Sequence, residues 1–296
     1  MAHQKIAIAG ATGNLGPAIV QALINAGFDV TILSQSGKTS GLPSAAKTVK
    51  VDYSSHQSLV NALQGHDAFV SAVPTHDTQP ALIDAAIAAG VKRFIPSEFG
   101  SNIAGNAKTA ALPVFKGKAI TQDYLKQKSS QISYTLICNG LFLDWGMQVG
   151  LWLDLKGGPT RVFDGGDDKH STTLLKDIGQ AVVGVLQHPD ETQNRAVYVQ
   201  SAAVSQNQLI EIARKVKPGV KIDRQDASVG QLLDDSHKQL AQGGDQVGSA
   251  MVGFIIVSVF GGSEEYGNLW SEKNDNELLG IKETSTQDLE ALIAGL

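Results

Sequence analysis

The chain has 296 residues, of which 42% are hydrophobic and 18% charged, and its net charge at pH 7 is −5. This composition is typical of a globular protein, and the acidic balance, without an arginine-rich stretch, argues against nucleic-acid binding. The single cysteine, Cys138, excludes an internal disulfide. The N-terminal residues lack a secretory signal pattern, and the longest apolar stretch is shorter than the about 18 residues that suggest a membrane span. We therefore expect a cytoplasmic protein with no membrane contact.

The first half of the chain alternates short β-branched runs with longer segments whose apolar residues recur every three or four positions. This alternation predicts strands at 5–10, 29–33, 48–52, 68–73, 93–96 and 134–138. Between them it predicts helices at 14–27, 54–65, 78–90 and 115–127. Strands that alternate with helices form right-handed βαβ units, so we expect an α/β fold with a doubly wound parallel, Rossmann-like sheet.

The alternation of predicted strands and helices becomes less regular after residue 150. The sequence predicts a strand and turn at 160–166, a helix at 176–189, a further strand at 195–201 and a helix at 205–216 with Ser205 as N-cap. Residues 220–296 look helical and glycine-punctuated, and the apolar run 250–262 is interpreted as a buried helix, with a mobile pocket wall or a subunit contact as the alternative.

These patterns suggest two regions. We expect a dinucleotide-binding domain at 1–150, to which 176–200 returns, and a smaller, mostly helical substrate-binding region at 151–296. Its place as the far wall of a substrate cleft follows from what such folds commonly do, and not from the periodicity.

A three-glycine motif follows the first strand. Gly10, Gly13 and Gly16 stand between this apolar strand and an apolar helix, which is the context of a dinucleotide-binding loop. Glycines allow the sharp turn and the approach of the backbone to a pyrophosphate, and the helix N-terminus then binds the phosphate charge. The amides or hydroxyl would come from Thr12, Asn14 and Leu15. The alternative is a tight turn without a ligand.

The choice between NAD and NADP depends on the residues that follow the second strand. Asp29 precedes that strand and so lies four residues, about 13 Å, from the end where a ribose would bind. The strand is followed by residues without a carboxylate, namely Ser34, Gln35, Ser36 and Lys38, which suit a 2′-phosphate. Lys38 could equally be a solvated loop residue. Asp52 could accept from adenine or cap the next helix.

Several stretches resemble one known family. They are "GATGNLG" at 10–16, "ALIDAAIAAGVKRFIPSEFG" at 81–100, "PVFKGK" at 113–118, "YTLICNGLF" at 134–142 and "DNELLGI" at 275–281. The chain thereby resembles the isoflavone reductase-like group of atypical short-chain dehydrogenases and its NmrA-like fungal relatives, over nearly its whole length. This group includes plant pinoresinol–lariciresinol and phenylcoumaran benzylic ether reductases. Its members carry an arginine after the second strand, where this chain has Gln35.

The resemblance implies a catalytic lysine on the helix after the "SEFG" loop. The family spacing from Phe115 selects Lys118, which also contacts the cofactor, and leaves Lys116 as the runner-up. Further cofactor contacts are expected from Ser71, Val73, Gly140 and Phe142, and substrate contacts from Ser97, Glu98 and Phe99, of which Phe99 would wall the cleft. Glu98 could instead cap nearby loop amides.

A rival catalytic pair has the Tyr-x-x-x-Lys spacing of ordinary short-chain dehydrogenases. Tyr124 and Lys128 share one face of the same helix. However, Tyr124 lies about 9 Å further along the axis than Lys118, away from the sheet edge, so a packing role is favoured. No histidines stand at metal-ligand spacing, so we expect no metal. His170 is interpreted as a loop residue, with a place in the lining of the cleft as the alternative.

The expected function is that of an NADPH-dependent reductase acting on an aromatic or conjugated small molecule. Lys118 would exchange a proton with the substrate oxygen while the cofactor delivers hydride. One alternative is an NmrA-like regulator that senses dinucleotides without catalysis and binds a protein partner. Another is an isomerase or cyclase on the same fold, because a fold does not fix the chemistry. The assembly is expected to be a monomer or a homodimer.

Overall fold

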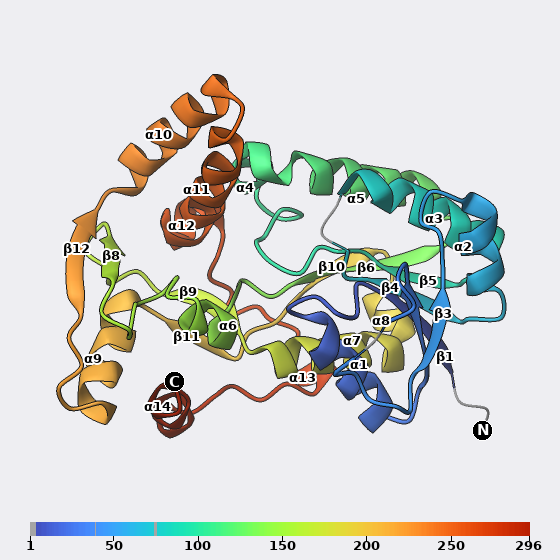
Figure 1. Ribbon diagram of the computed structural model, residues 1–296, viewed down its shortest axis with the longest axis horizontal. Coiled ribbons are helices and arrows are strands. Elements are labelled where there is room, and N and C mark those ends of the chain that lie inside the picture. The colour runs from blue at the N-terminus through green and yellow to red at the C-terminus, as the bar shows by residue number, and fades with distance from the viewer. Residues whose placement is uncertain (1–3, 39, 74–75) are drawn as a thin grey trace.

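The computed structural model describes residues 4–38, 40–73 and 76–296. Within them, a central sheet of seven parallel strands has the order β10-β6-β5-β4-β1-β2-β3 (Figure 1). The strands are β1 (Lys5–Ala9), β2 (Asp29–Ser34), β3 (Lys47–Lys50), β4 (Ala68–Ser71), β5 (Arg93–Ile95), β6 (Ser133–Cys138) and β10 (Arg195–Tyr198). All seven were expected from the sequence, including the late strand that returns to the sheet.

Helices cover both faces of this sheet. α1 (Gly16–Asn25) packs with α7 (Leu175–Gln187) on one face, while α2 (His56–Leu63), α3 (Gln79–Ala88) and α5 (Lys116–Lys128) cover the other. The two faces are visible within β1, where Ile6 and Ile8 belong to the core beneath α1 and Ala7 and Ala9 to the core beneath α2 and α3. The doubly wound Rossmann-like prediction is therefore confirmed.

A second region lies beside the sheet and contains a core of its own. Two small sheets, of order β11-β9-β7 and β12-β8, combine with helices around Trp152, Phe254 and Phe260. Their strands are β7 (Leu141–Phe142), β8 (Pro159–Phe163), β9 (His170–Thr173), β11 (Ala202–Val204) and β12 (Asp223–Ala227). The main helices are α9 (Gln206–Val216), α10 (Val229–Gln242), α11 (Gln246–Phe260) and α14 (Thr286–Ala294).

Short helices connect these elements. They are η1 (His76–Thr78), α4 (Ala107–Ala110), η2 (Pro113–Phe115), α6 (Leu143–Gln148), α8 (Pro189–Thr192), α12 (Ser263–Tyr266) and α13 (Asn276–Leu279). The division into a 1–150 domain and a 151–296 region stays a prediction.

Three details of this region can be compared with the sequence. Ser205 caps α9 as expected, because its side chain accepts from the Gln208 amide at 3.2 Å. The apolar run that ends α11 is a largely buried helix. The loop assignment of His170 is wrong: this residue begins β9, is 2% exposed, and packs against the rings of Trp152 and Phe260.

Candidate active site

The glycine loop is shaped by close backbone contacts. A Cβ on Gly10, whose φ is +80°, would lie 2.5 Å from the main chain of Ala72. A Cβ on Gly16 would lie 2.4 Å from the main chain of Ala11, so neither position accepts a side chain without a backbone shift. A Cβ on Gly13, by contrast, would find its nearest neighbour, the Gly10 carbonyl oxygen, at 3.5 Å. The tight turn therefore requires glycine at Gly10 and Gly16, whereas the space beside the Gly13 Cα is free of close contacts.

A cavity of about 440 Å³ adjoins this loop. It lies beyond the carboxyl ends of β1, β2 and β4, where β1 and β4 lie on either side of the reversal in strand order that marks ligand sites in such sheets. The lining residues include seven predicted ones, Gly10, Thr12, Gly13, Ser34, Gln35, Ser36 and Val73. They also include Tyr53 and Thr78, which sequence reasoning missed.

The loop after β2 forms one side of this cavity. The Ser34 hydroxyl accepts from the Gly37 amide at 3.1 Å, and the Ser36 hydroxyl accepts from the Lys38 amide at 3.1 Å. Lys38 is exposed. Asp29 lies at the opposite end of β2, as expected from its position in the sequence, and pairs with Lys47 at 3.1 Å.

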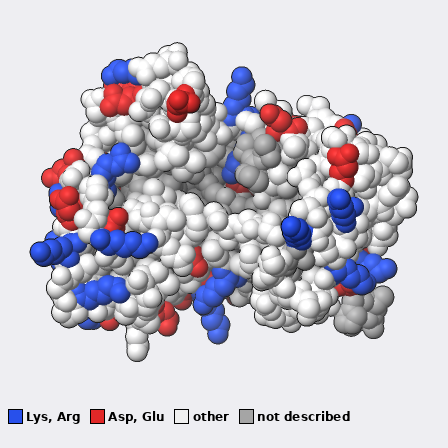
Figure 2. All heavy atoms as spheres, in the orientation of Figure 1, with Lys and Arg blue, Asp and Glu red and all other residues white. Residues whose placement is uncertain are grey.

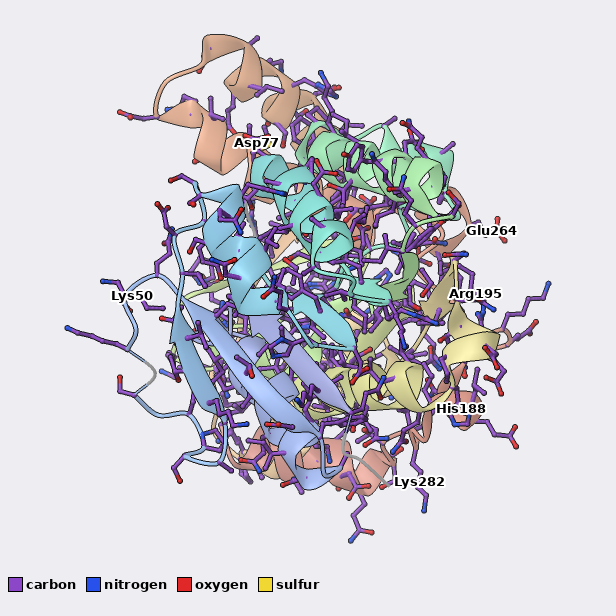
Figure 3. All side chains as sticks on the ribbon, turned by 90° about the vertical axis from the view of Figure 1, so that its right-hand side faces the viewer. Lys50, Asp77, His188, Arg195, Glu264 and Lys282 are labelled. Carbon is purple, nitrogen blue, oxygen red and sulfur yellow. The ribbon has the colours of Figure 1, made fainter. Side chains whose placement is uncertain are left out.

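A second lysine beside this loop was missed. Lys50 is the register partner of Ser34 in the β2–β3 pair, and a Cβ on Gly37 would lie 3.9 Å from the Lys50 Cβ. Figure 3 shows Lys50 at the edge of the molecule opposite Arg195. The signal that could have found it is the parallel pairing of consecutive strands, which brings their last residues together.

Other predicted cofactor residues have more specific places. Ser71 is fully buried, and its hydroxyl accepts from Gln79 Nε2 at 3.0 Å, so its side chain supports the loop after β4 instead of lining the cavity. The N-cap alternative for Asp52 is wrong, because Ser55 caps α2 by accepting from the Ser58 amide. The Asp52 carboxylate accepts from the Ser54 amide at 2.9 Å.

The remaining candidates lie at both ends of the same sheet edge. Asn14 is exposed, and Leu15 is buried where α1 begins. Gly140 follows β6 with a φ of +63° and donates its amide to the Gly100 carbonyl at 3.0 Å, and Phe142 is half-buried in β7. The loop after β5 and the loop after β6 are thereby joined at this edge.

Lys118 points inward from α5. The helix follows η2, and its N-cap is Phe115, whose ring centroid lies 5.8 Å from Lys118 Nζ. Nζ donates to the main-chain carbonyl of Glu98, whereas Lys116 is exposed. Burial lowers the pKa of Lys118, and the nearby negative charge of Glu98 partly offsets that decrease. Of the two lysines, Lys118 alone meets the "SEFG" loop.

That loop differs from the expectation in two ways. Glu98 is only 3% exposed, and its carboxylate accepts from Gln122 Nε2 at 2.7 Å, so it neither caps loop amides nor faces an open cleft. Phe99 is 9% exposed and belongs to the core beneath α1 and α7, so most of its ring packs against the sheet. Ser97 is half-buried and remains the candidate of the three for substrate contact.

The rival tyrosine faces another helix. The Tyr124 hydroxyl donates to Asp84 Oδ1 on α3 at 2.5 Å, and Lys128 Nζ lies 5.2 Å from the centroid of the Tyr124 ring. Tyr124 thus joins α5 to α3, which agrees with a packing role.

Figure 2 shows a hollow between the α10–α11 hairpin and the half of the molecule that carries the sheet, with few charges on its walls. Within the described ranges, no three His, Cys, Asp or Glu side chains group as a metal site. None of the helices in the described part of the chain has the length and apolarity to cross a membrane.

The NmrA-like family matches residues 2–242. The oxidoreductase poxI of Penicillium oxalicum is 32% identical over 99% of this chain and 94% of its own length. The oxidoreductase aprR of Aspergillus flavus is 32% identical over 98% of both chains.

Solved structures share the fold. AtPrR2 with NADP⁺ and (+)-pinoresinol has a TM-score of 0.77 at 21% identity, with 99% of both chains covered. The ternary complex of leucoanthocyanidin reductase from Vitis vinifera has a TM-score of 0.76 at 20% identity, with 98% of both chains covered. The glycine loop, the "SEFG" loop and these similarities together show that the chain belongs to the NmrA-like family, among its isoflavone reductase-like oxidoreductases.

Proposed function

We propose that this protein is an NADPH-dependent reductase of an aromatic or conjugated small molecule, in which Lys118 exchanges a proton with the substrate oxygen. The observation that carries the proposal is the position of Lys118, whose ammonium is held by the Glu98 carbonyl at the carboxyl edge of the sheet. The relatives support the reaction class, since two similar fungal proteins are named oxidoreductases. The structural neighbour AtPrR2 binds NADP⁺ together with (+)-pinoresinol.

The cavity beside the glycine loop fits a dinucleotide. Gly10 and Gly16 leave no room for a Cβ, which is the backbone shape that lets a pyrophosphate approach a helix N-terminus. Ser34 and Ser36 line this cavity, the Lys38 amide donates to the Ser36 hydroxyl, and Lys50 is the register partner of Ser34. These residues would hold a ribose 2′-phosphate, and no carboxylate occurs among residues 34–38 to repel it.

Lys118 would act on the proton of the substrate. NADPH, when bound, supplies the hydride. Burial lowers the pKa of Lys118 toward working pH, where proton exchange is most efficient. The neutral amine would deprotonate a phenol and so drive out a leaving group, and the ammonium would stabilise or protonate an oxyanion during reduction of a carbonyl or enone. The apolar ring of Phe115 limits the solvation of the same amine.

The proposal is tested by incubating the protein with NADPH and a panel of phenolic and polyketide-like substrates while following absorbance at 340 nm. We expect substrate-dependent loss of absorbance with the parent protein and its loss in Lys118→Ala, with NADPH affinity kept within a few-fold. Lys116→Ala is the matched control, since that side chain is exposed on another face of α5. Equal turnover by Lys118→Ala and the parent would refute the role of Lys118. NADPH binding without turnover of any substrate would favour the regulator.

A further inference from the structure

Glu98 carries a buried carboxyl group that has no role in the proposed reaction as described so far. Its side chain accepts from Gln122 Nε2 at 2.7 Å, and its main-chain carbonyl accepts from Lys118 Nζ. Gln122 and Lys118 are four residues apart on α5, so they lie on the same side of that helix and both meet Glu98. One residue of the loop is therefore held twice by one helix, and one of the two contacts is the amine of the proposed acid–base residue.

We infer that Glu98 is a positioning residue for Lys118: its carbonyl fixes the amine, and its buried carboxyl sets the pH range over which the amine exchanges its proton. The inference rests on the proposed role of Lys118 and deepens it. Glu98 itself contacts no reacting atom. The positioning role therefore replaces the role in substrate binding that was expected for Glu98.

The electrostatics of the pair support this. An ammonium removed from water loses solvation, which an opposite charge nearby restores in part. Burial lowers the pKa of Lys118, and Glu98 is the strongest influence in the opposite direction. Burial likewise raises the pKa of Glu98, which Lys118 and the Gln122 hydrogen bond partly offset. Each group thus stabilises the charged form of the other.

The other groups that face the pair leave this coupling intact. Cys138, at the end of β6, is buried, and burial raises the pKa of its thiol further above the usual range, so it stays neutral at working pH. Asp275 also raises the pKa of the Cys138 thiol, but it does not shift the pKa of Lys118. On the side of η2, the amine meets the uncharged ring of Phe115. Glu98 is therefore the charge to which Lys118 responds.

The test removes the charge of Glu98 and keeps its shape. In Glu98→Gln the new amide can still accept from Gln122, but the negative charge beside Lys118 is gone. The pKa of Lys118 should fall, so the inflection of kcat/KM against pH should move to lower pH, whichever charge state of the amine is active. Removal of a nearby opposite charge typically shifts a pKa by about 1–3 units, so we expect a displacement of about one unit or more.

A second readout does not depend on turnover. The ligand-free protein, labelled at lysine Cε with ¹³C, is titrated by NMR, and the Lys118 signal is assigned by its absence from Lys118→Ala. Its midpoint should move downward in Glu98→Gln as the kinetic inflection does. Glu98→Asp keeps the charge and should move the Lys118 midpoint less. Glu290→Gln removes a carboxylate paired with Lys215 on the surface and should leave it unchanged.

A variant on the other side of the contact guards against a folding failure of Glu98→Gln. Gln122→Met removes the hydrogen bond that favours the charged carboxylate, so Glu98 should keep its proton to higher pH and the Lys118 midpoint should again fall. An unchanged Lys118 midpoint in Glu98→Gln, or in Gln122→Met where the former does not fold, overturns the inference.

That failure is distinct from a failure of the proposed function. If Lys118→Ala retains full turnover, the proposed function fails, whatever the midpoints do. If Lys118→Ala is inactive but removal of the Glu98 charge moves neither the NMR midpoint nor the kinetic inflection, only the role of Glu98 is wrong.

Discussion

Substitution of the middle glycine should separate cofactor binding from folding. In Gly13→Val the new Cβ finds its nearest neighbour at 3.5 Å, an ordinary contact, so the fold should be retained. The branched side chain would instead stand on the wall of the 440 Å³ cavity, where the pyrophosphate must approach the backbone. Hydrogen bonds to charged groups contribute about 1.5–3 kcal/mol each, so the loss of two would weaken NADPH binding by about two to four decades.

The contrast with Gly16 makes this test specific. In Gly16→Val the Cβ would lie 2.4 Å from the backbone of Ala11, which must move, and overpacking of this kind costs about 1–3 kcal/mol or more. Binding is measured by fluorescence titration and folding by far-UV circular dichroism and thermal unfolding. We expect Gly13→Val to lose NADPH binding at a nearly unchanged Tm. Gly16→Val should lose NADPH binding and also have a lower Tm. Parent-like NADPH affinity in Gly13→Val would mean that the loop is only a turn.

Two further predictions concern residues beside the site. Lys38→Ala and Lys50→Ala should each weaken NADPH binding by about one to two decades if the cation contacts the 2′-phosphate, and should leave the affinity for NADH nearly unchanged. Parallel titrations with both cofactors show which lysine contacts the phosphate. Equal NADPH and NADH affinities in the parent protein would contradict both assignments. Tyr124→Phe should keep turnover and lose about 1 kcal/mol of unfolding free energy, because its hydrogen bond to Asp84 is removed. Urea unfolding measures this change. Loss of turnover in Tyr124→Phe would instead support the Tyr/Lys mechanism.

Local pattern was sufficient for most of the sheet. β-branched runs and the glycine-loop context predicted the strands of the central sheet, and the predicted glycine loop adjoins a cavity as expected. β12 was missed because "DRQDA" is polar and exposed, and only its pairing with β8 makes it a strand. Lys50 was missed for a related reason, since it is brought to the loop by pairing with Ser34.

The "SEFG" loop shows a different limit. The resemblance implied that this loop lies at the carboxyl edge of the sheet, so Glu98 and Phe99 were expected to face the cleft. Their burial depends on tertiary contacts, since α5 lays Gln122 and Lys118 over Glu98 while Phe99 joins the core beneath α7. Neither contact can be predicted from local sequence, because both depend on how the helix packs on the sheet.

In the proposed reaction, this chain transfers hydride from NADPH while Lys118 exchanges the proton. Its most direct test is a single turnover with NADPH that carries deuterium at both C4 positions, using a substrate identified from the panel, with the product analysed by mass spectrometry. We expect one deuterium in the product of the parent protein, and a rate about 10²–10⁴-fold lower in Lys118→Ala at unchanged NADPH affinity. A product without deuterium, or an equal rate in Lys118→Ala, would contradict it.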